Sequence, residues 1–163
     1  MSVGPLRFGM SHQQAIEAME AEGFLCDALR IETQYGRLNR RAEFRVPDAP
    51  EGAAPVTTYF LDHKSLAVVA VDALRGPQVW LDAIRLVGQE PSKLTERVWD
   101  YVTERGMPCM LSVEGEVSSE ELGLMVRAQW AGDARLSRPI FVKCDGWACM
   151  VHDCVPTTEW NVR

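Results

Sequence analysis

The chain has 163 residues, of which 47% are hydrophobic and 25% are charged, and its net charge is -6 at pH 7. The length and composition predict one domain over residues 1–163 with a sizeable core, and the order of the predicted elements makes that domain α+β. The negative charge argues against nucleic acid as the main partner, because binding to phosphates needs a basic face. There is no apolar run of ~18 residues and no export signal, so we expect a cytoplasmic protein with no membrane partner.

The first predicted element is a helix over residues 12–22. Ser11 is a good N-cap, and Gln14, three residues later, completes the pattern of a capping box. Gly23 follows the last helical residue, where glycine commonly ends a helix. The chain therefore begins its folded part within its first dozen residues.

Strands are predicted next, separated by short turns that favour antiparallel pairing. The segment 66–71 is wholly apolar and is typical of a central strand, and 79–87 is expected to form one continuous strand. A loop rich in proline and glycine covers 47–55. The expected strands of this first part are residues 28–31, 42–46, 56–61, 66–71 and 79–87.

A second helix is predicted from Ser92 to about Gly106, with apolar residues at helical spacing in Leu94, Val98 and Val102. Further strands are expected over 122–130, 136–144 and 147–151. The order predicts a mostly antiparallel sheet with two main helices packed on one face. Segments 6–23 and 86–106 share an apolar lead-in, a glycine, a helix and a closing glycine, which leaves an internal duplication open.

Metal binding and catalysis both lack a good motif. Cys144, Cys149, His152 and Cys154 offer four possible zinc ligands, but their spacing lacks a Cys-x2-Cys pair, and buried cysteine is commonly plain core packing. No Gly-rich phosphate loop and no flanking pattern of a cysteine nucleophile is present. We therefore expect no metal, no cofactor and no catalytic residues.

The densest run of like charge lies between Ser112 and Leu122, in the most acidic third of the chain. It contains Glu114, Glu116, Glu120 and Glu121. The simplest interpretation is a solvated loop with a short helical turn, and the functional alternative is an acidic edge for a cationic partner. Trp130 is the aromatic residue that would anchor such a partner.

The opening Leu6-Arg7-Phe8-Gly9-Met10-Ser11 resembles the start of small bacterial immunity proteins encoded beside toxins, and of uncharacterised actinomycete-type proteins with a helix followed by a meander of strands. The resemblance covers residues 6–23. It implies a helix start and carries no site residue with it.

Two hypotheses on function follow. The first is a non-enzymatic immunity protein that neutralises a cognate toxin by protein–protein contact, with a cationic toxin domain as partner. Glu114, Glu116, Glu120, Glu121 and Trp130 would then be the partner-binding residues. The alternative is a small enzyme or ligand-binding protein with a pocket between sheet and helices, for which a deep apolar pocket would speak.

Overall fold

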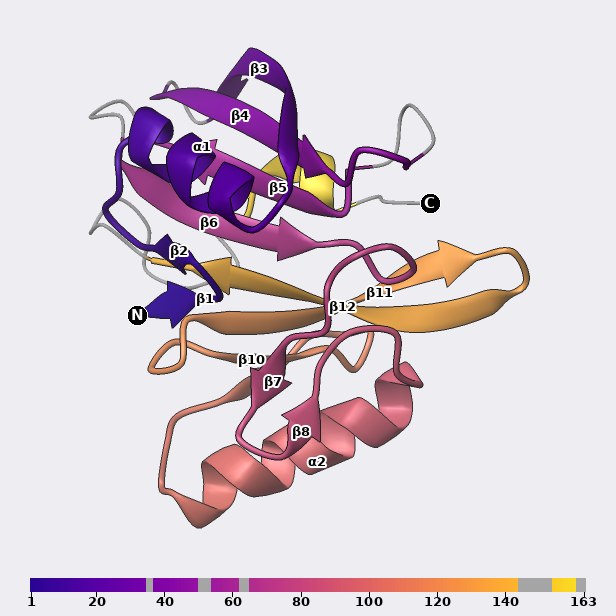
Figure 1. The fold of residues 1–163 in the computed structure, drawn as a ribbon. Coiled ribbons are helices and arrows are strands. Elements are labelled where there is room, and N and C mark those ends of the chain that lie inside the picture. Colours follow the sequence, from indigo (N-terminus) through magenta and orange to yellow (C-terminus); the bar gives the residue numbers. More distant parts are fainter. Residues whose placement is uncertain (35–36, 50–53, 62–64, 144–153, 161–163) are drawn as a thin grey trace.

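A computed structural model describes residues 1–163 except 35–36, 50–53, 62–64, 144–153 and 161–163. Two helices lie on one face of an eight-stranded antiparallel sheet, so the chain has the α+β fold that the sequence predicts (Figure 1). No helix in the described part of the chain is both long and apolar enough to cross a membrane.

The same order of elements occurs twice along the chain. A two-stranded hairpin, a helix and a meander of four strands form the first half, and the second half repeats them. The first half contains β1 (Ser2–Val3), β2 (Leu6–Arg7), α1 (His12–Ala21), β3 (Leu25–Gln34), β4 (Arg37–Arg45), β5 (Val56–Phe60) and β6 (Leu66–Val71). The second contains β7 (Trp80–Leu81), β8 (Ile84–Arg85), α2 (Pro91–Glu104), β9 (Met110–Leu111), β10 (Val117–Ser119), β11 (Leu124–Ala131) and β12 (Ala134–Val142).

The two halves meet at the centre of the sheet. Its strand order is β3-β4-β5-β6-β12-β11-β10-β9, so the last strand of each half pairs with its counterpart, and Ala70 lies opposite Ile140. The chain enters each helix in the same way: Gly9 N–H donates to Leu66 O, and Gly88 N–H donates to Ser137 O. The repeat hinted at by segments 6–23 and 86–106 is therefore present in the order of elements and in their contacts.

Helix α1 begins and ends as its sequence predicts. Ser11 Oγ accepts a hydrogen bond from Gln14 N–H, and Gln14 Oε1 accepts one from Ser11 N–H, so both bonds of the capping box are present. At the other end Gly23 has φ +84°, and its N–H donates to Glu20 O while Phe24 N–H donates to Met19 O. This pair of bonds is the Schellman motif, which needs a residue that tolerates positive φ.

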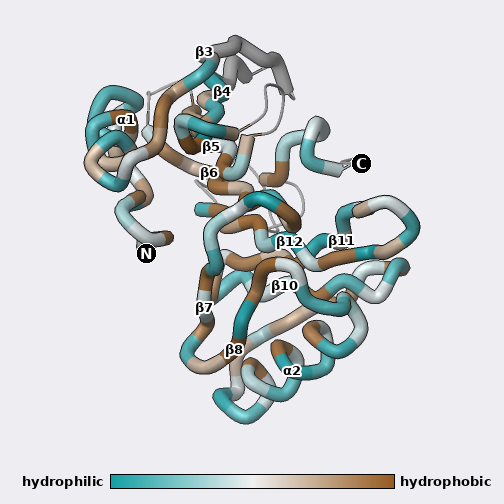
Figure 2. The backbone as a smooth tube through the Cα atoms, turned by 45° about the vertical axis from the view of Figure 1, so that its right-hand side comes forward, coloured by the Kyte–Doolittle hydropathy of each residue, from teal (hydrophilic) through white to brown (hydrophobic). Residues whose placement is uncertain are grey.

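Helix α2 differs at its start. Pro91 is its first residue and Glu90 is its N-cap, with no side-chain bond to the helix, so Ser92 does not cap it. Leu94, Val98 and Val102 are buried as predicted, and Figure 2 shows hydrophilic and hydrophobic residues alternating around this helix.

We expect Ser11→Ala to lower the free energy of unfolding by about 0.5–2 kcal/mol, because it removes the acceptor of one capping bond and leaves the fold otherwise intact. Thermal unfolding measures the effect. Ser92→Ala is the matched control, since the Ser92 hydroxyl is exposed and bonds only to Glu90. Equal melting temperatures for the two variants would contradict the role of the cap.

The segment 79–87 is not one strand, as the sequence analysis expected. It forms the short hairpin β7–β8 outside the main sheet, where Trp80 pairs with Arg85 and Leu81 with Ile84. The chain reverses at Asp82, whose φ is +49°. Aspartate tolerates this conformation in a two-residue turn, and that turn divides an apolar run that otherwise resembles a strand.

Other boundaries shift by a few residues, and the described chain has five additional short elements: β1, β2, β9, β10 and a 3-10 helix at Thr157–Glu159. Segment 66–71 is the central strand β6, as predicted, and all of its residues are buried. The strands expected at 28–31, 42–46, 56–61, 122–130 and 136–144 are β3, β4, β5, β11 and β12. The short strand β10 lies within segment 112–121, where a solvated loop was expected, and 147–151 lies outside the described residues.

Candidate functional site

The described part of the C-terminal segment, residues 154–160, covers the face of the sheet opposite the helices. Alternate residues of the central strands form a second apolar cluster there, and the cluster includes Cys154 and Val155, with Trp160 packed at its edge. The strand residues of this cluster include Tyr59, Val68, Ala70, Met125, Ile140 and Val142. The 3-10 helix η1 (Thr157–Glu159) therefore lies over the join between the two halves.

A buried ionic cluster holds this segment in place. Glu159 is 4% exposed, and Arg138 Nη2 lies 2.5 Å from Glu159 Oε2. The Tyr59 hydroxyl donates to Glu159 Oε1 and also lies 2.9 Å from Thr158 Oγ1. Burial, and then the neighbouring Glu159 carboxylate, raise the pKa of Tyr59 well above its ordinary value. The phenol thus stays protonated and donates its hydrogen bond to Glu159, so the cluster anchors the C-terminal segment.

A second buried ion pair lies on strand β11 and the loop before β10. Arg127 Nη1 lies 2.7 Å from Glu116 Oε2, and Arg127 Nη2 donates to Trp160 O at 2.9 Å. The guanidinium also lies 4.7 Å from the centroid of the Trp160 ring. Glu116 Oε1 accepts a hydrogen bond from Ala128 N–H. The C-terminal segment is therefore tied to both halves of the sheet.

A polar hollow of about 340 Å³ lies beside the buried pair of Arg138 and Glu159. Arg138, Glu159 and Gln129 form part of its wall, and Arg138 Nε has no hydrogen-bond partner among the described residues. Gln129 is already engaged, since its Nε2 donates to Asp72 Oδ2 at 2.7 Å and its Oε1 accepts from Ala73 N–H. Gln129 and the Arg138–Glu159 pair are thus engaged within the protein.

Two residues that line the polar hollow have large, exposed apolar side chains. Trp130 is 50% exposed and Leu74 is 57% exposed, and both contribute to its lining. Trp130 lies near the tip of the β11–β12 hairpin, which extends beyond the neighbouring strands (Figure 1). Across this hairpin the guanidinium of Arg135 lies 5.8 Å from the Trp130 ring centroid. An exposed aromatic on a regular hairpin is a preformed contact surface.

The five residues predicted to bind a partner differ in their exposure to solvent. Glu114, Glu120 and Glu121 are exposed, whereas Glu116 is 4% exposed and paired with Arg127. Glu116 therefore adds nothing to an exposed acidic edge, because its charge is neutralised inside the protein. The sequence does not indicate this, since Arg127 lies eleven residues further along the chain.

Two of the three exposed glutamates lie far from Trp130. Glu120 and Glu121 lie in the turn before Leu124, at the start of β11, and Trp130 is six residues along that strand. At about 3.3 Å per residue the separation is about 20 Å. Glu114 lies in the β9–β10 loop, near Glu116, whose carboxylate contacts Ala128 close to Trp130. Of the acidic residues proposed, only Glu114 lies at the Trp130 end.

The possible zinc ligands Cys144, Cys149 and His152 lie outside the described residues. Cys154 is described, and it is buried in the apolar cluster on the face opposite the helices. Within the part of the chain that the structure describes, no group of three His, Cys, Asp or Glu side chains is placed to hold a metal ion.

A second, apolar hollow of about 400 Å³ lies between the sheet and the elements on its helix side. Its wall includes Met19 of α1, Val69 and Val71 of β6, and Phe141 of β12, and the exposed Trp80 also lines it. This is the position at which the sequence analysis placed a pocket in its alternative hypothesis.

Comparison with known proteins adds no relative. No family model matches the chain, and no curated protein and no solved structure matches it either. Arguments about function therefore rest on the contacts, burial and charges described above.

Proposed function

We propose that this chain is a non-enzymatic immunity protein, which neutralises a cognate bacterial toxin by direct protein–protein contact. The observation that carries the proposal is the pair of exposed apolar side chains, Trp130 and Leu74, in the lining of the polar hollow. A few buried aromatic and aliphatic anchors supply most of the affinity of an interface, and polar surroundings exclude water around them.

The polar hollow supports a binding role more than a catalytic one. Arg138 and Glu159 neutralise each other, and Gln129 is held by Asp72 and Ala73. A general acid or base must be within reach of substrate and must be able to change its protonation state, which a buried ion pair resists. The hollow is instead suited to receive a side chain of the partner while Trp130 and Leu74 cover flanking apolar surface.

The net charge favours a cationic toxin domain as the partner. At -6 the chain attracts a basic surface, and Glu114 provides an exposed carboxylate at the Trp130 end. Glu120 and Glu121 are too far away to touch the same contact, so their effect would be on the rate of encounter. Rim charges mainly accelerate association, whereas buried anchors slow dissociation.

Trp130→Ala is expected to weaken toxin binding by about 2 kcal/mol or more, mostly as faster dissociation, because truncation of an aromatic anchor removes its buried area. The test is co-expression with the toxin domain encoded beside the gene, followed by dissociation rates of the purified complex. Trp80→Ala is the matched control. Trp80 is 56% exposed and faces Arg85 across its own hairpin at 5.9 Å, as Trp130 faces Arg135 at 5.8 Å.

Two results would argue against this function. One is that the unaltered chain fails to protect cells from the neighbouring toxin domain. The other is that the Trp130→Ala and Trp80→Ala variants dissociate from the toxin at the same rate. The toxin would then contact a surface other than the polar hollow.

A further inference from the structure

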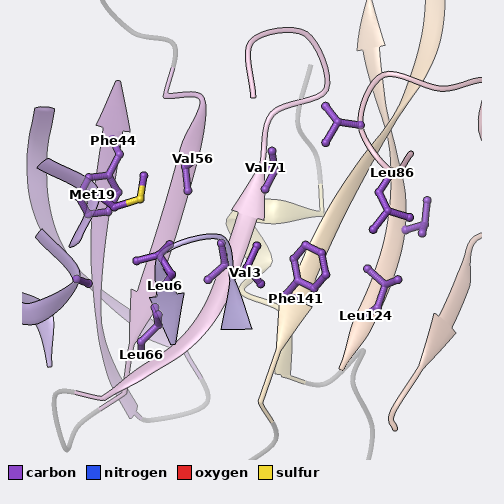
Figure 3. Close-up of a cluster of buried hydrophobic side chains, with 14 of the residues drawn as sticks. Val3, Leu6, Met19, Phe44, Val56, Leu66, Val71, Leu86, Leu124 and Phe141 are labelled. Atoms are coloured by element: carbon purple, nitrogen blue, oxygen red, sulfur yellow. The ribbon is translucent and has the colours of Figure 1, made fainter. Parts of the chain in front are cut away.

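The apolar hollow lies at the seam between the two halves of the fold. Figure 3 shows Met19, Leu6 and Leu66 packed together under the first half, and Leu86 and Leu124 together under the second. Val71 and Phe141 lie between these two groups. Each helix covers its own half of the sheet, and the β1–β2 hairpin and the segment before β7 lie over the centre beside Met19.

The wall of this hollow offers a ligand almost nothing but hydrocarbon. Val3, Val69, Val71 and Phe141 are buried residues of the main core. Gln78 also lines it, but its Oε1 accepts from the N–H groups of residues 86 and 87, and its Nε2 donates to the carbonyl of residue 87. The Gln78 amide therefore makes three hydrogen bonds that hold its own segment in place.

The volume and position of the apolar hollow limit the kinds of ligand that it can bind. The hollow measures about 400 Å³, whereas an apolar cavity of about 150 Å³ already holds benzene. Trp80, an exposed residue of its lining, has the Arg85 cation over its ring, and the exposed Glu22 also lies on the lining. A ligand here needs an apolar body in the seam and a polar end in water.

We propose that the apolar hollow binds the unbranched aliphatic chain of a small amphiphile, and that the polar end of this amphiphile lies at Trp80. This site is separate from the polar hollow and does not depend on the toxin-binding function. Burial of hydrocarbon drives the binding, because the buried part of the wall is formed by apolar side chains.

Titration of the unaltered chain with a series of straight-chain alkanoates, below their micelle concentrations, tests this inference. The affinity is expected to rise about fourfold for each added methylene, and then to level off once the tail fills the hollow. One alkanoate should bind per chain. An affinity that rises without levelling off, or the absence of saturable binding, would overturn the proposal.

A variant that fills the hollow gives the second test. Val79 lines the hollow and is only partly buried, so Val79→Phe is expected to lower alkanoate affinity about tenfold, which corresponds to excluding about two methylenes. Trp130→Ala is the control and should bind alkanoate normally. Equal affinity in Val79→Phe would overturn the site. If that variant does not fold, the levelling-off measured on the unaltered chain still decides.

Phosphatidylcholine vesicles distinguish a free amphiphile from a membrane source. We expect saturable alkanoate binding and no co-sedimentation with vesicles, because the seam admits one chain and not a bilayer. Co-sedimentation without saturable alkanoate binding would assign the apolar surface to membrane adsorption and would overturn the proposal.

Discussion

Glu159→Ala is expected to destabilise the protein by about 3–5 kcal/mol, because it leaves a buried cation without its partner. Arg138 is 4% exposed, and in the native protein it lies 2.5 Å from the Glu159 carboxylate. The same substitution removes the acceptor of the Tyr59 hydroxyl. Urea unfolding, followed by far-UV circular dichroism, measures the loss as a lower midpoint.

A double variant distinguishes the cost of an unpaired charge from the cost of lost side-chain packing. Replacing both Arg138 and Glu159 with leucine removes the two charges together, so no unpaired ion remains, and much of the lost stability should return. A loss of less than about 1 kcal/mol in Glu159→Ala would contradict a buried pair, since exposed pairs contribute only that much. If the double variant were as unstable as the single one, the loss in the free energy of unfolding would come from altered packing and not from an unpaired charge.

The parts of the fold that sequence predicted are those governed by neighbouring residues. The capping box of Ser11 and Gln14 and the stop at Gly23 depend on bonds between residues three to five apart. The central strand β6 is recognisable because six consecutive apolar residues suit burial on both faces. The buried stripe of α2 follows from the helical period alone.

The parts that sequence could not predict depend on distant partners. The acidic segment 112–121 resembles a solvated loop, yet β10 lies within it, because Val117–Ser119 pairs with β11 on one side and β9 on the other. Local composition carries no record of this pairing. The division of segment 79–87 by one aspartate turn is a similar case, since its apolar pattern alone does not distinguish a strand from a hairpin.

The candidate site was harder still to predict. The Tyr59 hydroxyl meets a carboxylate 100 residues away in the chain, and Arg138 meets the same group across 21 residues. Of the five residues proposed from sequence, Trp130 proved to be exposed and Glu116 proved to be buried. A dense run of charge indicates where charge is concentrated, but it does not indicate which member is paired inside the fold.

The buried position of Glu116 leads to an expectation that separates it from its three neighbours. Glu116→Gln is expected to cost about 3 kcal/mol or more in the free energy of unfolding, because the Arg127 charge would remain buried without a counter-ion. Arg127 also contacts the Trp160 carbonyl and ring, so the C-terminal segment should loosen with it.

The matched control is the triple variant in which Glu114, Glu120 and Glu121 become glutamine. These three side chains are exposed, so the triple variant should unfold at the same urea concentration as the unaltered chain, within about 0.5 kcal/mol. Its association with a cationic toxin should be slower and less dependent on salt, because only long-range attraction has been removed. If Glu116→Gln were as stable as this triple variant, its carboxylate would have to be solvated, and the ion pair with Arg127 would not exist in solution.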